Sequence, residues 1–274
     1  AVRAILRLGT YEIAFSDGVP AHAAVDQAVR QARSLRGTKT RSSARAGVVN
    51  AVMRRIAADS PARLAELERG GVATAALQHS MPDWIADRLV ASLGADDAIE
   101  VMRAAAESAE SAVRWNPLRG PRAGLEAELP EGWSTDPRMP QAYVLPGAFA
   151  LEESRSWARG LVMGQSRASQ LVSHVLDPRP GERILDLCAA PGAKATHLAA
   201  LTRGAARITA VELRPARAEA LRQLARRMGA VIDVVEGDGV SVPLEGGFDA
   251  VLVDPPCTGL GVLSSRPDAR WRRR

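Results

Sequence analysis

Acidic and thiol side chains stand at the ends of four predicted strands in the second half of the chain. The first strand, RILDL, runs into a turn of small residues, Cys188-Ala-Ala-Pro-Gly-Ala. The next three predicted strands end on acids, which are Glu212, Asp238 and Asp254, and Cys257 follows the last of them. Because parallel strands end at the same edge of a sheet, the spacing predicts that these side chains share one site.

The turn at residues 188–193 has almost no side-chain bulk, so a ligand can lie directly on its backbone. A helix is predicted at 193–201, and the start of a helix offers free N–H groups and a partial positive charge. Glu212 lies 24 residues after Cys188, and a carboxylate at the tip of a second strand commonly accepts hydrogen bonds from ribose hydroxyls. The pattern predicts a nucleotide-like ligand, although the G-x-G-x-x-G fingerprint of dinucleotide sites is absent.

Strands and helices alternate around these residues, which predicts a parallel α/β sheet. One possible strand order places the third strand at one edge and the fourth beyond the first. The nine residues between Asp238 and Phe248 reach about 30 Å, enough to make that crossing without a helix. The expected strands are 184–187, 206–213, 231–238 and a fourth around 250–253, with helices at 160–176, 193–201 and 215–229. In the helix at 160–176 we expect Ala168, Leu171, Val172 and Val175 to point inward.

Composition allows two domains and excludes several protein classes. The chain has 274 residues, of which 46% are hydrophobic, but no run of 18 apolar residues that would span a membrane. Its two cysteines, Cys188 and Cys257, form neither a disulfide framework nor a zinc cluster, so a reducing cytoplasm fits best. The net charge of +5 is compatible with an RNA partner.

The first half of the chain has apolar residues at helical spacing. We expect helices up to about Phe15, at 21–34 and at 46–57, a basic loop at 37–45, and a separate helix opening at Ser60-Pro61. Further helices are expected around Trp84, as a core anchor, and at 95–107, followed by irregular structure at 117–147 that could include short strands. Four arginines, Arg41, Arg45, Arg54 and Arg55, could contact phosphates or simply form a solvated face.

The motifs of the second half closely resemble the Sun/Fmu/Nop2 (RsmB/NOP) family of RNA cytosine-C5 methyltransferases, and most of all its bacterial small-subunit rRNA branch. The resemblance rests on DLCAAPGAK at 186–194, Glu212, GDG at 237–239, and DPPCTGLGV at 254–262 continuing through RPDARW at 266–271. Upstream, LRLGTYEI, VPAHAAVDQAV and GVVNAVMRRIA resemble the NusB-like RNA-binding domain that precedes the catalytic part, and VRWNP at 113–117 stands in place of the family's R-x-N-x-L segment.

This resemblance implies a Rossmann-like α/β sheet, truncated after strand four, preceded by an all-α NusB-like domain. The expected domains are a partial NusB-like domain at 1–72, a linking helical and irregular domain at 73–160, and the start of the methyltransferase domain at 161–274. The implied cofactor is S-adenosylmethionine and the implied partner is small-subunit ribosomal RNA. We expect a cytoplasmic monomer with no metal and no membrane segment.

The resemblance also implies a role for each site residue. Cys188, Ala189, Ala190, Pro191, Gly192, Ala193 and Lys194 would hold the methionine and ribose portion of the cofactor, with Glu212 on the ribose hydroxyls, Asp238 on the adenine amine and Arg217 nearby. Asp254 would lie near the methionine ammonium and the target base, and Asp186 would orient the turn. Two histidines, His174 and His197, are expected to be structural.

The spacing nominates Cys257 as the nucleophile that adds to the cytosine ring. In the family, however, a second cysteine in a T-C-S motif after strand five makes the covalent bond, and the cysteine of D-P-P-C assists product release. Residues 1–274 contain no T-C-S motif. We therefore expect a fragment that lacks both ends of the family's length, with partial cofactor affinity and no turnover.

Two other functions are compatible with the sequence. An amino-methyltransferase would carry an aromatic residue after D-P-P, whereas this chain has Cys257. A non-catalytic NusB-like RNA-binding module with a remnant cofactor domain would bind RNA without binding the cofactor.

Overall fold

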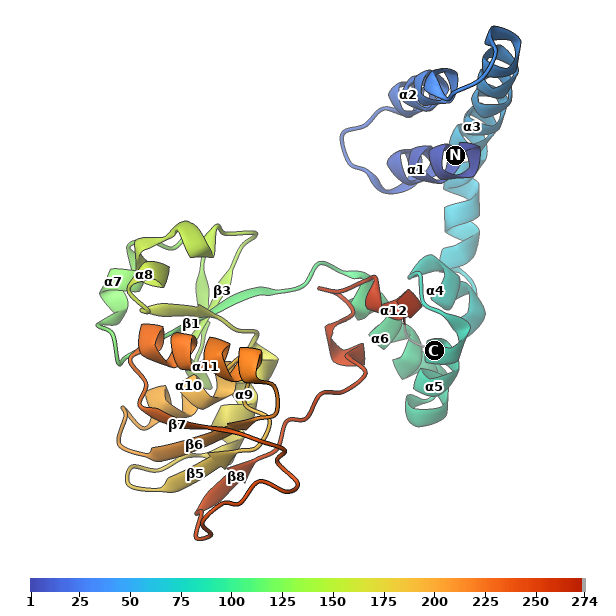
Figure 1. Cartoon of the computed structure of the whole chain (residues 1–274). Helices are drawn as coiled ribbons and strands as arrows, with labels where there is room; N and C mark the ends of the chain where they lie inside the picture. The colour runs from blue at the N-terminus through green and yellow to red at the C-terminus, as the bar shows by residue number, and fades with distance from the viewer. Residues whose placement is uncertain (273–274) are drawn as a thin grey trace. The chain divides into compact units, whose positions relative to one another are not determined.

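The computed structural model describes residues 1–272, apart from the side chain of Glu68. The chain forms two compact units (Figure 1). One contains Ala1–Ser108 together with the segment from Leu260, and the other contains Ala109–Gly259. In the described part of the chain, no helix is both long and apolar enough to cross a membrane.

The first unit begins with three packed helices, α1 (Val2–Phe15), α2 (Ala21–Ser34) and α3 (Lys39–Glu68). Their shared core is formed by buried apolar side chains that recur at helical spacing, which are Ile5, Val25, Ala28, Ala32, Val49 and Met53. The sequence correctly predicts α1 and α2, but the loop predicted at 37–45 is helical from Lys39 onward, and no break occurs at Ser60-Pro61.

One continuous helix, α3, runs through the second part of the predicted loop and through Ser60-Pro61. The Thr38 side chain caps its start by accepting a hydrogen bond from the backbone N–H of Arg41 at 3.4 Å. Arg45 donates to the carbonyls of Leu35 and Arg36, each at 3.1 Å, so this basic segment is tied to the end of α2. The helix continues through Pro61, although proline has no N–H to donate to the hydrogen-bond ladder.

A second helical cluster in this unit contains α4 (Val72–Gln78), α5 (Asp83–Leu93) and α6 (Ala95–Ala106). Its core includes Ile85 and Met102, with Trp84 packed against it, as expected of a core anchor. The segment with η2 (Leu260–Val262) and α12 (Ala269–Arg272) joins the same cluster through buried Leu263. Arg270 is also buried there and donates to the carbonyl of His79 at 2.7 Å.

The second unit starts with an antiparallel sheet in the order β2-β3-β1-β4. Its strands are β1 (Ser111–Trp115), β2 (Ser134–Asp136), β3 (Met139–Leu145) and β4 (Val162–Gly164), accompanied by α7 (Arg122–Glu126), η1 (Leu151–Glu153) and α8 (Arg155–Ala158). The expected irregular segment at 117–147 therefore contains two strands. Tyr143 and Leu145 of β3 are buried in one core with Val113 and Val162, and Trp133 packs edge-on against Tyr143.

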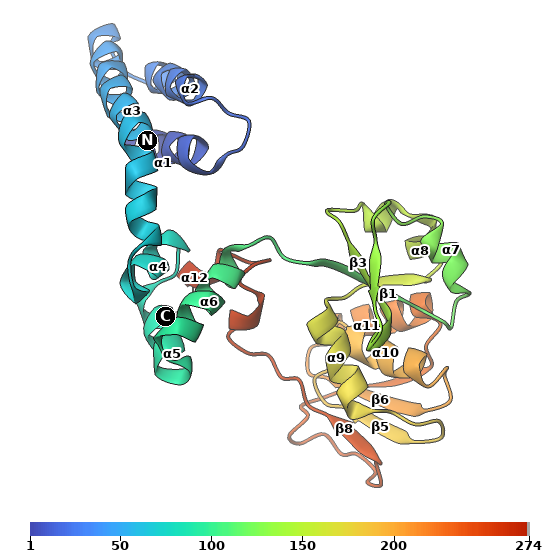
Figure 2. The same cartoon turned by 180° about the vertical axis from the view of Figure 1, so that it is seen from behind.

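The expected helix at 160–176 is only partly present, because its first residues form β4 and only α9 (Arg167–Leu176) is helical. Its predicted inward face is correct only at Val172, which packs against the core of the parallel sheet. Gln170 and Ser173 are fully buried, whereas Leu171 is 49% and Val175 is 76% exposed. The Gln170 amide donates to the carbonyl of Gln165 at 2.9 Å, so a polar face of α9 packs inward. Figure 2 shows α9 beside α10.

A parallel sheet in the order β7-β6-β5-β8 completes this unit. Its strands are β5 (Arg183–Asp186), β6 (Arg207–Glu212), β7 (Ile232–Glu236) and β8 (Ala250–Leu252). The helices α10 (Ala193–Leu201) and α11 (Pro215–Met228) cover one face (Figure 1). The sheet has the strand order that the link between β7 and β8 allows, and no helix lies between these two strands. This order puts the ends of all four strands at one edge.

Candidate functional site

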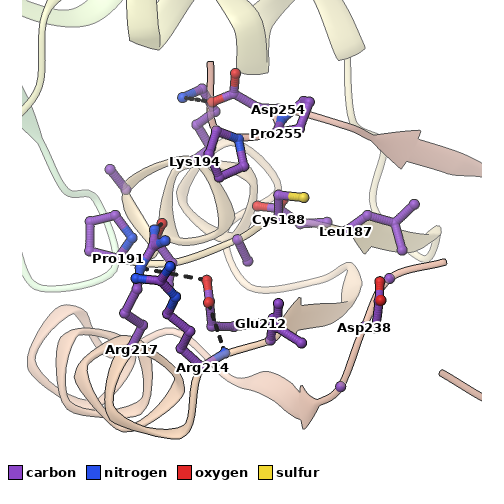
Figure 3. A pocket seen from close by; sticks show the side chains of 18 of the residues that line it. Leu187, Cys188, Pro191, Lys194, Glu212, Arg214, Arg217, Asp238, Asp254 and Pro255 are labelled. Carbon is purple, nitrogen blue, oxygen red and sulfur yellow. Dashed lines mark hydrogen bonds and ion pairs between the residues drawn. The ribbon is translucent and has the colours of Figure 1, made fainter. Parts of the chain in front are cut away.

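A cavity of about 580 Å³ lies at the carboxyl edge of the parallel sheet (Figure 3). Its lining draws on the segments that follow all four strands. Predicted residues that line it are Cys188, Ala189, Ala190, Pro191, Ala193, Lys194, Glu212, Arg217, Asp238, Asp254 and Cys257. The structure thus brings together the side chains that their spacing in the sequence predicted to share one site.

One predicted residue, Gly192, lies behind the cavity wall instead of lining it. It precedes α10 with a positive φ of 105°, a conformation that favours glycine. A Cβ at this position would lie 3.1 Å from Cγ of Leu221 on α11. Gly192 therefore lets the turn pass close to α11 and start α10 at the floor of the cavity.

Glu212 is the most buried acid on the β6 side of the cavity, with 5% of its surface exposed. Its carboxylate accepts a hydrogen bond from the backbone N–H of Arg214 at 3.0 Å and lies 3.7 Å from Nε of Arg217 (Figure 3). Arg217 also donates to the carbonyl of Ala190. The arginine therefore ties the small-residue turn to the acid at the end of β6.

Lys194 and Asp254 form an ion pair of 2.6 Å on the opposite side of the cavity (Figure 3). Lys194 is at the start of α10 and Asp254 follows β8, so the pair joins two elements that are distant in sequence. Asp254 remains half-exposed on the cavity side.

Asp186, at the end of β5, has an unusual carboxyl group. It is 1% exposed, and its Oδ2 has no hydrogen-bond partner among the residues that the structure describes. Burial raises the pKa of Asp186 to about 6; the backbone N–H of Cys188 and the charge of Lys194 oppose this rise. A buried carboxyl of this kind favours a positive charge in the cavity.

Asp238 follows β7 and is exposed at the rim of the cavity. The N–H of Val240 donates to its Oδ1 at 3.0 Å, which fixes the direction of the carboxylate. Gly239 lets the backbone approach closely, since a Cβ there would lie 3.2 Å from the carbonyl oxygen of Leu187. The turn after β7 is thereby held against the turn after β5.

The two cysteines have different surroundings. Cys257 is exposed, and its Sγ accepts a hydrogen bond from the N–H of Gly259 at 3.4 Å. Cys188 is partly buried, and burial, followed by the charges of Asp186 and Glu212, raises the pKa of its thiol. Cys257 is therefore the more accessible of the two thiols to a ligand in the cavity.

The sequence analysis did not identify every residue that lines the cavity. It did not include Arg214, whose backbone N–H orients Glu212, or the wall residues Leu187 and Leu213. Position alone, two residues after a strand-ending acid, could have indicated Arg214. In the described part of the chain, no three His, Cys, Asp or Glu side chains are grouped to hold a metal ion.

We expect Asp186→Asn to change how stability depends on pH. The folded pKa of about 6 exceeds the ordinary value of 3.8, so the stabilising contribution of the protonated acid is present at low pH and lost as pH rises through 6. The wild type should lose roughly 2 kcal/mol more than the variant between pH 4.5 and pH 7. Urea unfolding at both pH values measures this; equal losses in the two proteins would contradict the buried, raised-pKa state.

Comparisons with known proteins agree with this architecture. Residues 173–274 match the family described as 16S rRNA methyltransferase RsmB/F, and residues 1–58 match the NusB family. A Mycobacterium tuberculosis protein named as a methyltransferase is 39% identical over 98% of this chain and 59% of its own length. A Sodalis glossinidius protein named ribosomal RNA small subunit methyltransferase B is 32% identical over 100% of this chain and 61% of its own length.

Among solved structures, a crystal structure described as PH0851 superposes with a TM-score of 0.72 at 26% identity, covering 100% of this chain and 61% of that one. The chain thus spans about three fifths of the length of these relatives. The predicted fold class, a NusB-like helical region followed by a Rossmann-like methyltransferase sheet, is confirmed. The resemblance that the motifs indicated is thus confirmed: residues 173–274 match the RsmB/F methyltransferase family and residues 1–58 match the NusB family.

Proposed function

We propose that the protein containing these residues methylates carbon 5 of a cytosine in small-subunit ribosomal RNA. The observation that carries this proposal is the shared cavity. An exposed thiol, Cys257, and a half-exposed carboxylate, Asp254, face the same space as the acids that follow β6 and β7. A thiol beside a carboxylate suits nucleophilic catalysis on a ring carbon.

The residues present fit S-adenosylmethionine. The turn at 188–193 exposes backbone to the cavity, and Glu212 and Asp238 supply acceptors for hydroxyl and amine groups. The unpartnered Oδ2 of Asp186 makes the cavity favourable for a cation. When bound, the cofactor supplies an electrophilic methyl group carried on a positively charged sulfur.

Cytosine carbon 5 is a poor nucleophile until a thiolate adds to carbon 6 of the ring. That addition places electron density on carbon 5, and a base later removes the carbon-5 proton so that the thiolate can leave. Asp254 is proposed to assist by stabilising a proton on ring nitrogen 3. Lys194, which pairs with Asp254 at 2.6 Å, would hold this carboxylate in place.

Cys257 is proposed to take part in release of the product, by resemblance to the family's D-P-P-C cysteine. The covalent cysteine of the family lies in a T-C-S segment, which residues 1–274 do not contain. We therefore expect residues 1–274 alone to bind the cofactor without completing methyl transfer. Incorporation of labelled methyl groups into unmodified small-subunit rRNA by this chain would overturn that expectation and would make Cys257 the nucleophile.

The RNA partner is supported by where the positive charge lies. Residues 1–72 contain twelve Lys and Arg against six Asp and Glu, whereas the rest of the chain is nearly balanced. Two of the four predicted phosphate contacts are already engaged, since Arg45 donates to backbone carbonyls and Arg55 pairs with Asp59 at 3.4 Å. Arg54 instead lines a groove between α2 and α3 together with Arg33, which makes this groove the better candidate for phosphate contacts.

The test is deletion of the gene in its own organism, followed by mass spectrometry of the nucleosides of small-subunit rRNA. We expect one 5-methylcytosine to be lost and to be restored by the wild-type gene but not by a gene carrying Asp254→Asn. Loss of an N4-methylated cytosine would instead support the amino-methyltransferase. An unchanged nucleoside profile would support the non-catalytic RNA-binding module.

A further inference from the structure

We propose that Arg114, on β1 of the antiparallel sheet, is a positioning residue that holds the cofactor-binding turn in its binding conformation. This inference rests on the proposed function, because it assigns the turn at 188–193 to S-adenosylmethionine. Arg114 belongs to neither the cavity lining nor the parallel sheet. Its action would be indirect, through the first turn of α10.

The contacts of Arg114 converge on that first turn. The side chain is fully buried, with 0% of its surface exposed. Its Nη1 donates to the carbonyl of Ala193 at 2.9 Å, and its Nη2 donates to the hydroxyl of Thr196 at 3.1 Å. That hydroxyl in turn donates to the carbonyl of Gly192 at 2.8 Å. The guanidinium of Arg114 is therefore hydrogen-bonded, directly or through Thr196, to the residues where the turn ends and α10 begins.

Three separate contacts then hold the turn along its length. The N–H of Ala189 donates to the carbonyl of Val211 on β6 at 3.0 Å, and Arg217 of α11 donates to the carbonyl of Ala190. Arg114 holds the third point, at Ala193. Because α10 is short and its start defines the cavity floor, loss of the third contact frees the end of the turn that adjoins Lys194.

The charge at this position is not explained by stability alone. No carboxylate in the described part of the chain forms an ion pair with Arg114, and burial together with the charge of Arg227 lowers the pKa of Arg114 to about 9. A cation near the start of a helix also opposes the helix dipole. A buried apolar side chain would commonly be less costly than an unpaired buried cation, so the presence of a charge here is consistent with a positioning role.

The same strand offers a matched control. Asn116, two residues further along, is also fully buried and donates through Nδ2 to the carbonyls of Gly160 at 2.8 Å and Met228 at 2.7 Å. These contacts hold the antiparallel sheet against the end of α11 and involve no residue of the cavity lining. Asn116→Ala therefore removes these two hydrogen bonds, and the one that Oδ1 accepts from the N–H of Leu118 at 3.1 Å, without touching the turn.

The experiment compares Arg114→Met, Arg114→Lys and Asn116→Ala. Calorimetric titration with S-adenosylmethionine measures affinity, thermal unfolding measures stability, and hydrogen exchange without ligand measures order in the peptide at 188–197. We expect both Arg114→Met and Asn116→Ala to lower the melting temperature. Only Arg114→Met should weaken affinity, by about 10-fold, and speed exchange in that peptide, while Arg114→Lys should recover part of both.

The proposal is overturned if folded Arg114→Met binds the cofactor as the wild type does, or if Asn116→Ala loses as much affinity. Should Arg114→Met fail to fold, Thr196→Val removes one acceptor of the guanidinium and should weaken affinity in the same direction; unchanged affinity would overturn the proposal. If the wild type itself binds no S-adenosylmethionine, the proposed function fails. The exchange rates of Arg114→Lys and wild type then still show whether Arg114 orders the turn.

Discussion

Glu212→Gln should weaken the binding of S-adenosylmethionine by about 100-fold. A buried carboxylate that accepts two hydroxyl hydrogen bonds contributes roughly 3 kcal/mol, because hydrogen bonds to charged acceptors are worth about 1.5 kcal/mol or more each. The amide of glutamine offers one acceptor oxygen and no charge. It can still accept the N–H of Arg214, which lies 3.0 Å from the carboxylate, so the fold should be kept. Isothermal titration calorimetry measures the change.

The matched control for this prediction is Glu219→Gln on the outer side of α11. Glu219 is exposed and pairs with Arg226 at 3.0 Å, and it does not line the cavity. Its replacement should leave affinity within a factor of two. If Glu212→Gln binds within threefold of the wild type, Glu212 does not contact the ribose and the assignment of the cavity is wrong.

Gly160→Ala should strongly destabilise the unit that contains the cavity. Gly160 has φ of 70°, and a Cβ there would lie 2.0 Å from the carbonyl oxygen of Arg227. The backbone at Gly160 and at Arg227 cannot shift easily to relieve this clash. The carbonyl of Gly160 accepts a hydrogen bond from Asn116, and that of Arg227 accepts one from Arg119 at 2.9 Å. We expect a loss of about 3 to 5 kcal/mol, or a fall of roughly 10 °C in melting temperature.

Gly147→Ala is the control for this substitution in the same unit. No atom lies within 4 Å of a Cβ built at Gly147, and its backbone has no positive φ. Its effect on the melting temperature should be within about 2 °C of zero. A similar effect of both substitutions would show that the close approach of Gly160 to α11 does not hold the two sheets together.

Much of the site could be predicted because its charged residues stand at or directly after the ends of strands. Glu212, Asp238 and Asp254 each follow an apolar run, and parallel strands bring such positions to one edge. The length of the link between Asp238 and Phe248 shows only that the observed strand order is feasible without a helix. The ion pair of Lys194 with Asp254 could not be predicted, since it depends on how α10 and β8 meet.

The failures arise where tertiary contacts outweigh local pattern. In α9, Gln170 is buried because the carbonyl of Gln165 accepts its amide proton, although Leu171 and Val175 are the more apolar residues. Around Pro61, a helix continues where local propensity predicts a break. From the sequence alone, Arg114 is a charged residue of a short strand. Its burial against α10 depends on how the two sheets pack, which the sequence does not show.

Calorimetric titration of residues 1–274 with S-adenosylmethionine, beside the Asp238→Ala variant, tests the central claim most directly. Asp238 lines the cavity, and its carboxylate is oriented by the N–H of Val240, so it is placed to accept from an adenine amine. We predict saturable binding at one site per chain that Asp238→Ala weakens by at least about 10-fold, as expected for loss of a charged hydrogen-bond acceptor. No heat of binding from a wild-type sample that shows cooperative thermal unfolding would contradict the account and would make RNA binding the working function of these residues.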